Sequence, residues 1–370
     1  MTTRDYSIEI SRDLASIEAE WAALEGEGAS TPFQTLAWLK PLYRYFAPGM
    51  KASPLFVLVR GQHSGKLQML LPLCVIPRYG VDFIEFADFG VSDYNAPVLA
   101  AEFDPSPAEW LRLWRQIGQR LTMGTTLHLK KMPKLIAGRA NPLAMIDDCR
   151  EMPIGTWGVA LPATMDEYKQ QAFSEKFRQE MGRKARKLAR AGAVEYFVAE
   201  NPAQRREIFA VLARQRQARC DEMGRVNGLT NPYNLRFREA MNEEMSSPVH
   251  LGALKVEGRI IATALTLRYR KSSFGIMFSY DGGDWRTYSL GNLLIIRTVE
   301  NSIDDGIGYF DFLIGDEAYK AGFGMVRQPL YEAVIPLSRF GALVSFALGK
   351  AVALKRSRDR AAAKEVELSA

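Results

Sequence analysis

Two stretches near the carboxyl end of the sequence combine acidic, hydroxyl and small residues in an order suited to group transfer. The first, residues 280–292, reads YDGGDWRTYSLGN, and the second, residues 309–320, reads YFDFLIGDEAYK. Attack by an amine requires a base, because an amine is a nucleophile only when it is deprotonated, and the leaving group requires a proton. The carboxylates are candidate bases, and the tyrosine of the second stretch is a candidate acid or orienting hydroxyl. These candidates are Asp281, Asp311, Asp316, Glu317 and Tyr319.

The first stretch also predicts an anion site. A strand ends at Tyr280, and a helix is expected to begin in the small and polar run from Tyr288 to Asn292. The first-turn N–H groups of a helix have no partner within the helix, and the helix dipole favours negative charge there. A diphosphate suits such a site, although Ser and Asn also cap helices that bind no ligand.

The residues of the second stretch have structural alternatives. Asp316 and Glu317 either supply the base and bind an acceptor ammonium, or they form the N-cap and first-turn acid of a short helix. Asp311 lies inside a predicted strand, which favours a structural role. Lys320 either contacts an acidic group of a substrate or pairs with Asp316 at i, i+4 spacing. His250, at the head of a strand, is expected to be a satisfied edge residue rather than a base.

Composition excludes several classes of protein. Of 370 residues, 47% are hydrophobic and 24% are charged, which is typical of globular chains and not of disordered ones. Three Cys and three His, all widely spaced, predict neither a disulfide framework nor a metal site. The amino terminus lacks an apolar signal core, so we expect a cytoplasmic protein.

The formal net charge of +6 is concentrated rather than spread. Residues 176–190 carry seven cations and one anion, and residues 339–370 carry seven cations and three anions. Binding of the first stretch to RNA or DNA is conceivable, but its only nearby aromatic residues are Phe173 and Phe177. A solvated face, or a site for a substrate phosphate or lipid headgroups, is favoured, and no nucleic acid partner is expected.

The tail has an uncharged run, residues 340–349, followed after Lys350 and a short apolar segment by Lys355, Arg356, Arg358 and Arg360. This apolar stretch is shorter than the ~20 residues of a membrane span. It predicts either an interfacial amphipathic helix attracted to anionic lipids or a terminal helix packed on the body of the protein.

The remaining pattern repeats. Strand, turn, strand, strand, helix and strand occur in both halves, offset by roughly 190 residues. In the first half we expect strands at 6–11, 54–60, 66–77, 81–89 and 125–131, with helices at 13–24, 36–46 and 109–121. In the second half we expect helices at 164–191, 202–221, 232–246 and 289–305, with strands at 194–199, 250–256, 259–269, 272–280, 309–314 and 330–335.

This order resembles the GNAT acyltransferase superfamily, and the two stretches are similar to its CelD-like branch, relatives of the FemAB ligases that carry two GNAT-like units. Further similarity lies in TPFQTLAWL (31–39), in residues 92–94 and in the basic helix 183–190, so that the resemblance covers most of residues 6–335. D-F-L-x-G-D-E-x-Y-K is its specific part. The matching residues are Tyr280, Asp281, Tyr288, Ser289, Gly291, Asp311, Phe312, Gly315, Asp316, Glu317, Tyr319 and Lys320.

The resemblance implies an α/β (α+β) fold of two tandem GNAT-like units. Each unit is expected to be a mixed, mostly antiparallel sheet flanked by helices. The first unit spans residues 1–155, the second unit, which binds acyl-CoA, spans 156–336, and a basic amphipathic tail spans 337–370.

The resemblance also implies acyl-CoA as a cosubstrate, with no permanently bound cofactor and no metal. The implied donor-binding residues are Tyr280, Arg286, Ser289, Leu290, Gly291 and Asn292. The implied acceptor-binding residues are Asp93, Tyr94, Asp311 and Lys320. One departure is that Arg286-Thr-Tyr-Ser-Leu-Gly stands where GNAT proteins have Arg or Gln followed by a glycine-rich spacing. The long charged helical hairpin of FemAB relatives, which use aminoacyl-tRNA, is not found.

We therefore predict an acyl-CoA-dependent N-acyltransferase that acts peripherally at the cytoplasmic membrane face. Its acceptor is expected to be the amine of a lipid-like base, giving a ceramide-type amide, or of an amino sugar in envelope biosynthesis. The alternatives are a catalytically inactive partner of a polysaccharide or lipid synthase and a tRNA-dependent aminoacyl transferase.

Overall fold

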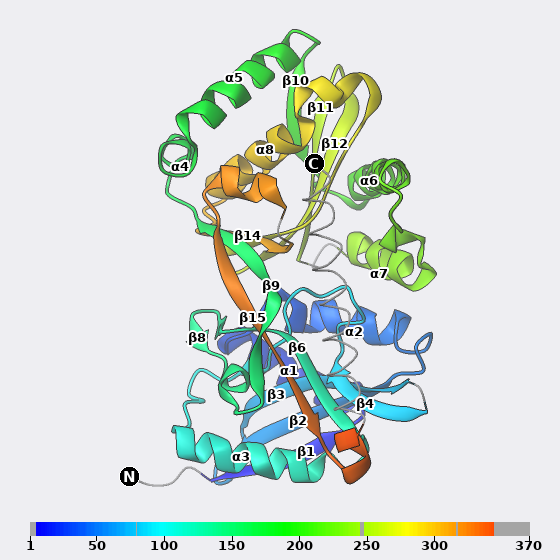
Figure 1. Ribbon diagram of the computed structural model, residues 1–370, viewed down its shortest axis with the longest axis vertical. Helices are drawn as coiled ribbons and strands as arrows, with labels where there is room; N and C mark the ends of the chain where they lie inside the picture. Colours follow the sequence, from blue (N-terminus) through cyan, green and yellow to red (C-terminus); the bar gives the residue numbers. More distant parts are fainter. Residues whose placement is uncertain (1–4, 79, 245–247, 316, 344–370) are drawn as a thin grey trace, which may run out of the picture.

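Two α/β lobes are stacked along the long axis of the computed structural model (Figure 1). It describes residues 5–78, 80–244, 248–315 and 317–343. The first lobe, blue and cyan in Figure 1, is built from the first half of the chain, and the second lobe, green and yellow, from the second half. A strand of each half extends into the other lobe.

The first lobe is an antiparallel meander that ends in a parallel pair. Its strands run β1–β2–β3–β4, and β4 then pairs with β6 in parallel over Phe83↔Thr126 to Glu85↔His128. A parallel pair requires a crossover connection, and α3 belongs to the segment that supplies it. The elements are β1 (Tyr6–Ser11), α1 (Leu14–Glu27), α2 (Leu36–Tyr45), β2 (Ser53–Gly61), β3 (Leu67–Arg78), β4 (Val81–Phe86), β5 (Val98–Leu99), α3 (Pro107–Arg120) and β6 (Thr126–Pro133).

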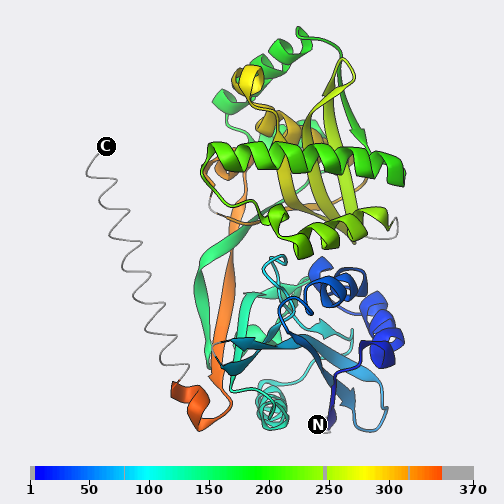
Figure 2. The ribbon, with the colours of Figure 1, turned by 90° about the vertical axis from the view of Figure 1, so that its right-hand side faces the viewer.

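The second lobe repeats this topology. Its strands run β10–β11–β12–β13, and β13 pairs with β14 in parallel over Ser272↔Tyr309 to Phe274↔Asp311. Helices α6 and α7 cover one face of its sheet and α8 the other (Figures 1 and 2). The predicted repeat is confirmed. The elements are β10 (Val194–Val198), α6 (Pro202–Glu222), α7 (Pro232–Glu243), β11 (Val249–Val256), β12 (Arg259–Tyr269), β13 (Ser272–Tyr280), α8 (Leu290–Asp304) and β14 (Tyr309–Ile314).

Two long strands join the lobes. β9 (Cys149–Ala160) follows the first lobe in the chain but pairs with β14 of the second. β15 (Val326–Pro336) follows the second lobe but pairs with β6 of the first, and β9 and β15 pair with each other. Both are seen crossing between the lobes in Figures 1 and 2. The two sheets are therefore one continuous sheet, which fixes the lobes relative to each other.

Local chemistry accounts for several element boundaries. Asp13 accepts a hydrogen bond from the Ala15 N–H and caps α1, as predicted. Ser106 and Glu109 form a capping box at the start of α3. Glu257 and Gly258, with φ of 47° and 76°, make the tight turn between β11 and β12, where the primed hairpin turns require positive φ.

Two predicted elements differ in the structure, and one long strand was not predicted. The helix expected at 164–191 is two helices, α4 (Met165–Ala172) and α5 (Glu175–Ala189), because Ser174 caps a new helix by accepting from the Phe177 N–H. The strand expected at 330–335 begins earlier, at Val326. The long strand β9 was not predicted, because Pro153 and two glycines interrupt its alternation and many of its side chains are exposed.

The lobes share one hydrophobic core. The largest cluster of buried side chains contains residues of both lobes. Across the interface the Trp38 ring of α2 meets the Phe237 ring of α7 edge to face, with centroids 4.9 Å apart. Phe33 meets Phe274 of β13 at 6.3 Å. This packing places the first-lobe loop that follows β4 against the second lobe.

The predicted tail lies mainly outside the described residues. Its apolar run beyond Leu343 and its basic flank, with Lys355, Arg356, Arg358 and Arg360, are not described. Among the residues that the structure does describe, no helix is long and apolar enough to cross a membrane.

Candidate functional site

The parallel strands β13 and β14 are paired at one end only. Three residue pairs join them, from Ser272↔Tyr309 to Phe274↔Asp311, although β13 has 9 residues. β14 is irregular beyond Asp311: its register on β9 shifts before Ile314, and Leu313 has a φ of 58°, a conformation that residues with side chains seldom adopt. The two strands therefore splay apart toward Tyr280.

The helix that follows β13 begins without a side-chain cap. A 3₁₀ segment, η4 (Gly283–Tyr288), leads to Ser289, which has a left-handed φ of 57° and makes no capping hydrogen bond. The N–H groups of Leu290, Gly291 and Asn292 thus form an uncapped first turn. The equivalent helix of the first lobe, α3, is different, because Ser106 and Glu109 cap it from within the chain.

Tyr280 lies directly against this helix start. A Cβ atom at Gly291 would be 2.9 Å from Cε1 of Tyr280, so glycine allows the ring to approach the helix backbone. The Arg219 guanidinium lies 5.7 Å from the centre of the same ring. Tyr280 and Arg219 also line a cavity of about 410 Å³ between α6 and the 280–286 segment.

Asp281 and Arg286 line this cavity too, and both already have partners. Asp281 accepts from Arg259 at 3.0 Å and from Gln215 at 2.9 Å. These contacts favour a structural role for Asp281. Arg286 pairs with Glu222 at 3.1 Å but is 68% exposed, so its guanidinium remains accessible to an anion.

Residues of the two lobes meet at Asp311. The Tyr94 hydroxyl, from the loop that follows β4, lies 2.6 Å from Oδ2 of Asp311 and 2.6 Å from the Thr156 hydroxyl of β9. The Leu313 N–H donates to Oδ1 of Asp311 at 2.7 Å. Asp93 is held toward the same strand, because the Ile314 backbone N–H donates to its carboxylate. The sequence-predicted residues Asp93, Tyr94 and Asp311 are thus brought together.

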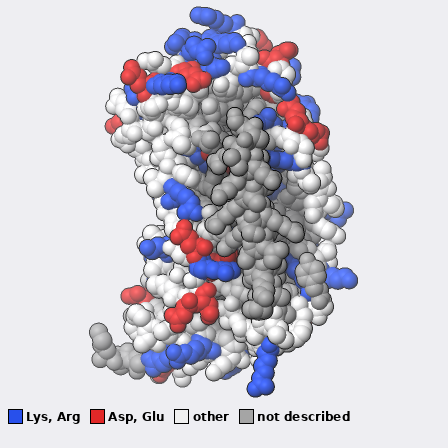
Figure 3. Space-filling model, in the orientation of Figure 1, with Lys and Arg blue, Asp and Glu red and all other residues white. Residues whose placement is uncertain are grey.

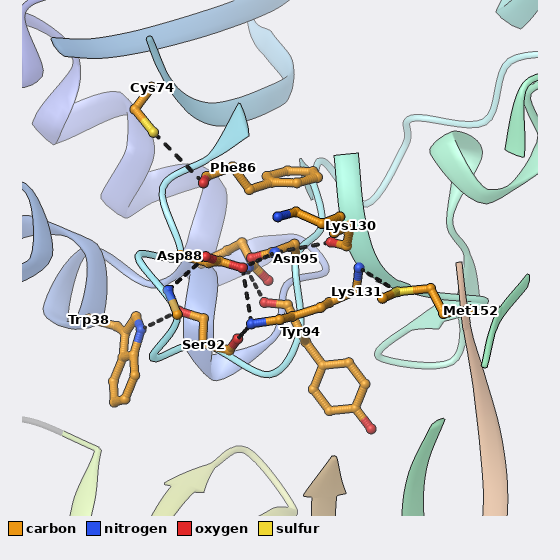
Figure 4. A network of polar contacts seen from close by, with 12 residues as sticks. Trp38, Cys74, Phe86, Asp88, Ser92, Tyr94, Asn95, Lys130, Lys131 and Met152 are labelled. Atoms are coloured by element: carbon orange, nitrogen blue, oxygen red, sulfur yellow. Dashed lines mark hydrogen bonds and ion pairs between the residues drawn. The ribbon is translucent and has the colours of Figure 1, made fainter. Parts of the chain in front are cut away.

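A polar network holds the Tyr94 loop in place (Figure 4). Lys131 pairs with Asp88 at 3.1 Å and donates to the Ser92 carbonyl at 2.8 Å. The Ser92 hydroxyl accepts from the Trp38 indole at 2.9 Å. The Tyr94 ring points away from this network, and its hydroxyl reaches the second lobe (Figure 4).

Lys320 is almost fully buried, with 2% of its surface exposed. Its ammonium donates to the Gly315 carbonyl at 2.8 Å and to the carbonyls of Phe312 and Leu313 at 3.2 and 3.3 Å. It also pairs with Glu317 at 3.0 Å. Lys320 therefore holds the backbone that follows Asp311 in its unusual conformation.

Glu317 stands at the start of the 3₁₀ helix η5 (Ala318–Phe323). It occupies the N-cap position but makes no capping hydrogen bond, and its side chain is 56% exposed. Tyr319 is 38% exposed and packs on Phe312 and Phe323. Burial raises the pKa of Tyr319 well above its usual range. Asp316 lies outside the described residues.

Electrostatics distinguish Asp311 from an ordinary strand residue. Burial raises the pKa of its carboxyl to about 7, while hydrogen bonds from Tyr94 and Leu313 act in the opposite direction. Burial also raises the pKa of Asp93 and holds that of Tyr94 well above its usual range. A carboxyl group with a shifted pKa between two lobes is typical of a functional site. A purely structural role, which the position of Asp311 in a strand predicted, therefore does not account for this residue.

Sequence reasoning missed Thr156 and Arg238. Thr156 belongs to the unpredicted strand β9. Arg238 of α7 is 4% exposed, lies over the Trp38 ring at 5.2 Å and is within electrostatic reach of Asp93. Burial lowers the pKa of Arg238 to about 10. The signal in the sequence was an arginine beside Phe237 on the apolar side of a predicted helix.

Comparisons with known proteins agree with this fold. Residues 175–321 match the family model of the acetyltransferase (GNAT) domain. FemX superposes with a TM-score of 0.63 at 11% identity, covering 91% of this chain and 100% of FemX. The C-terminal domain of an Agrobacterium fabrum protein named as a lysylphosphatidylglycerol synthetase superposes with a TM-score of 0.53 at 13% identity, covering 92% of this chain and 97% of that one. L-PGS from Bacillus licheniformis gives 0.51 at 13% identity, covering 90% and 96%.

No curated protein sequence is significantly similar to this chain. The fold and the match over residues 175–321 support a GNAT-type acyltransferase. Residues 175–321 match a GNAT acetyltransferase domain, and the chain as a whole has a fold similar to that of FemX. The resemblance to the GNAT superfamily is thereby confirmed, and so is the α/β fold of two joined GNAT-like units. Membership of the CelD-like branch stays a prediction.

The pKa of Asp311 predicts a pH dependence of stability. Its folded-state value of about 7 lies above the ordinary value of 3.8, so between these pH values the folded chain binds more protons than the unfolded one. The free energy of unfolding should therefore fall as pH rises from about 4 to about 7, by at most ~1.4 kcal/mol per pH unit from this group. Asp311→Asn cannot ionise and should lack this slope.

The measurement is urea unfolding of wild type and Asp311→Asn at several pH values between 4 and 8. The stability of the variant relative to wild type should increase with pH across this window. A difference that stays constant with pH would show that Asp311 titrates at its ordinary value.

Proposed function

We propose that the protein transfers an acyl group from acyl-CoA to the amine of a lipid-like base, forming a ceramide-type amide, or of an envelope amino sugar. The GNAT domain supports acyl transfer. One observation carries the donor assignment: of the two equivalent helices, α3 is capped by its own side chains, whereas the start of α8 is uncapped and lies beside the splayed strands. Free first-turn N–H groups and the helix dipole suit a diphosphate.

The basic helix α5 adds cations to this donor site. Lys184 donates to the Thr287 carbonyl at 2.6 Å, and Lys187 donates to the Thr287 hydroxyl at 2.7 Å. Lys187 also lies 4.4 Å from the centre of the Tyr288 ring. Both ammonium groups lie close to the start of α8, where their positive charge would stabilise the bound phosphates of a donor. We assign the diphosphate to Ser289, Leu290, Gly291 and Asn292, with Tyr280 and Arg286 beside it.

In the proposed reaction the acceptor amine attacks the thioester carbonyl carbon. A C–N bond forms, the C–S bond breaks, and CoA leaves as a thiolate. The amine proton passes to the acidic pair, in which Glu317 is exposed and Asp316 precedes it in the chain. The Tyr319 hydroxyl donates a proton to the thiolate, and the protonated acidic pair returns a proton to it. The acceptor binds between the lobes, against Asp93 and Tyr94 of the first lobe and Asp311 and Lys320 of the second.

Aminoacyl-tRNA is the second candidate donor, and α5 is the observation that favours it. This helix carries six Lys and Arg residues and two Glu, most of them exposed, and such a surface suits a nucleic acid backbone. An assembly role without catalysis is the third possibility. For the site of action we propose the cytoplasmic membrane face, with an anionic membrane surface as a partner.

The decisive experiment incubates the full chain with acyl-CoAs of different chain length and follows release of the free CoA thiol. Sphinganine and glucosamine serve as amine acceptors, and each reaction is repeated without acceptor. Acceptor-dependent thiol release is expected with at least one donor. If no acyl-CoA is consumed but a radiolabelled aminoacyl-tRNA transfers its amino acid, the tRNA-dependent reaction replaces the proposed one. No transfer from either donor would support the non-catalytic role.

A further inference from the structure

A cavity of about 330 Å³ lies between α5 and α8, on the face of the second sheet opposite α6 and α7. Its volume is within the range of small-molecule pockets, ~300–1,000 Å³. Its walls come from α4, α5, β10, β11 and α8 and are mainly apolar. They include Phe173, Met181, Leu188, Leu254, Leu293 and Ile296.

The cavity is open because α5 turns small residues toward it. Gly182, Ala185 and Ala189 line it at helical spacing. A Cβ atom added at Gly182 would meet only a guanidinium nitrogen of Arg186, at 3.4 Å. Larger residues at these positions would fill the space and contribute buried apolar area. The sequence instead leaves an apolar volume that a ligand can occupy.

Cations stand along the edge of the cavity. Its charged lining residues are Lys169, Arg178 and Arg297 and one carboxylate, Glu300. Arg297 is paired with Glu300 at 2.6 Å, and Lys169 with the exposed Asp166 at 3.6 Å. Arg178 makes a single long hydrogen bond, at 3.5 Å, to the Phe173 carbonyl and has no carboxylate partner in the described part of the chain.

The surface around the cavity is also cationic. The outer face of α5 carries Lys176, Arg183 and Arg186, all exposed. Lys and Arg side chains gather at the end of the molecule formed by α5 and β10 (Figures 1 and 3). An apolar cavity with an unpaired guanidinium at its edge is complementary to an amphiphile with one apolar chain and an anionic headgroup.

We propose that the α5–α8 cavity binds a single aliphatic chain of a lipid whose headgroup is anionic. The chain lies among Met181, Leu188 and Ile296, and the headgroup meets Arg178, with Lys169 beside it. This site lies outside the proposed acyl-transfer residues, so lipid binding there does not depend on the reaction. A free fatty acid and a membrane phospholipid present the same chemistry, and the experiment separates them.

The test uses the full chain and calorimetric titration with dodecyl phosphate below its micelle concentration. Dodecyl maltoside has the same chain with a neutral headgroup, and inorganic phosphate has the charge without a chain. Dodecyl phosphate should bind, dodecyl maltoside at least about tenfold more weakly, and inorganic phosphate not measurably. Equal binding of both dodecyl compounds would overturn the anionic headgroup, and no binding of dodecyl phosphate would overturn the site.

Variants then locate the ligand. Ala185→Phe fills the cavity and should lower the affinity for dodecyl phosphate at least tenfold, whereas Ala185→Ser should bind as wild type does. Arg178→Gln should weaken binding severalfold, whereas Arg190→Gln, which removes a cation from the far end of α5, should not. If thermal melting shows that Ala185→Phe is unfolded, Ala189→Leu replaces it. Wild-type affinity in a folded, cavity-filling variant would overturn the proposal.

Vesicles identify the source of the lipid. The same proteins are sedimented with phosphatidylcholine vesicles that contain or lack phosphatidylglycerol. Binding to anionic vesicles that is lost in the cavity-filling variant indicates a membrane phospholipid. Binding of monomeric dodecyl phosphate without sedimentation indicates a free fatty acid. Sedimentation that is unchanged by filling the cavity, with no binding of the monomeric probe, would show surface attraction alone and overturn the proposal.

Discussion

Replacing both members of the acidic pair, by Asp316→Asn and Glu317→Gln, should lower the rate of acyl transfer by roughly 10²–10⁴-fold, the contribution of a positioned general base. Glu317 is exposed, makes no capping hydrogen bond and stands directly after the splayed strand β14. A carboxylate that only began a short helix would contribute to stability and not to the chemical step. The measurement is the turnover of thiol release at saturating acyl-CoA and acceptor, with folding checked by thermal melting.

A matched control is available on the same sheet. Glu151 of β9 is also about half exposed and pairs with Arg327 at 3.1 Å, as Glu317 pairs with Lys320. Glu151→Gln removes a surface ion pair, which contributes at most ~1 kcal/mol, and should leave turnover unchanged. If the acidic-pair variant is folded and turns over as fast as this control, the base lies elsewhere, and Asp311 becomes the next candidate.

The second large effect is expected at the start of α8, where Asn292→Asp should lower the affinity for CoA about tenfold or more. The substitution keeps the shape of the side chain and adds a negative charge to the turn assigned to the diphosphate. Two like charges at close range in a partly buried site repel by more than ~1.4 kcal/mol, which corresponds to tenfold in affinity. An acid in the first helical turn favours the helix itself, so the variant should not lose stability.

The repeat supplies the control for this variant. Asn292 occupies the third helical position of α8, and the same position of α3 is Glu109, which caps its own helix. Ala108→Asp therefore adds a carboxylate to the first turn of the equivalent, capped helix and should leave CoA affinity unchanged. Gly291→Asp should lose more affinity than Asn292→Asp, because its Cβ also meets the Tyr280 ring. Calorimetric titration with CoA measures all three, and an unchanged affinity in Asn292→Asp would remove the diphosphate from α8.

Much of the architecture was predictable because its signals are local. The continuous apolar runs of β2 and β3, the Asp13 cap of α1 and the Glu257–Gly258 turn each depend on a few neighbouring residues. The repeat was visible because each half carries the same order of such signals. The uncapped start of α8 was also a local feature, which is why residues 288–292 could be proposed as an anion site before the fold was known.

The strands that join the lobes could not be predicted in the same way. β9 contains Pro153 and two glycines, and its partners, β14 and β15, lie more than a hundred residues away in the sequence. Strand pairing over such a separation is decided by the packing of the whole chain and not by the propensity of the segment. Thr156, which β9 brings to the site, was missed for this reason.

The sequence by itself determined the residue types of the candidate site: a carboxylate in the strand at 311, an acidic pair with a tyrosine after it, and a hydroxyl-rich loop at 92–94. Only the tertiary structure decided their environments. Tyr94 and Asp311 are 217 residues apart in the sequence and 2.6 Å apart in space. The strands β9 and β15 join the two lobes and close them around this contact. Asp311 is therefore only 4% exposed, and Lys320 is buried as well. A pKa depends on solvation and on charges close in space, so the functional character of Asp311 follows from the fold and not from its position in the chain.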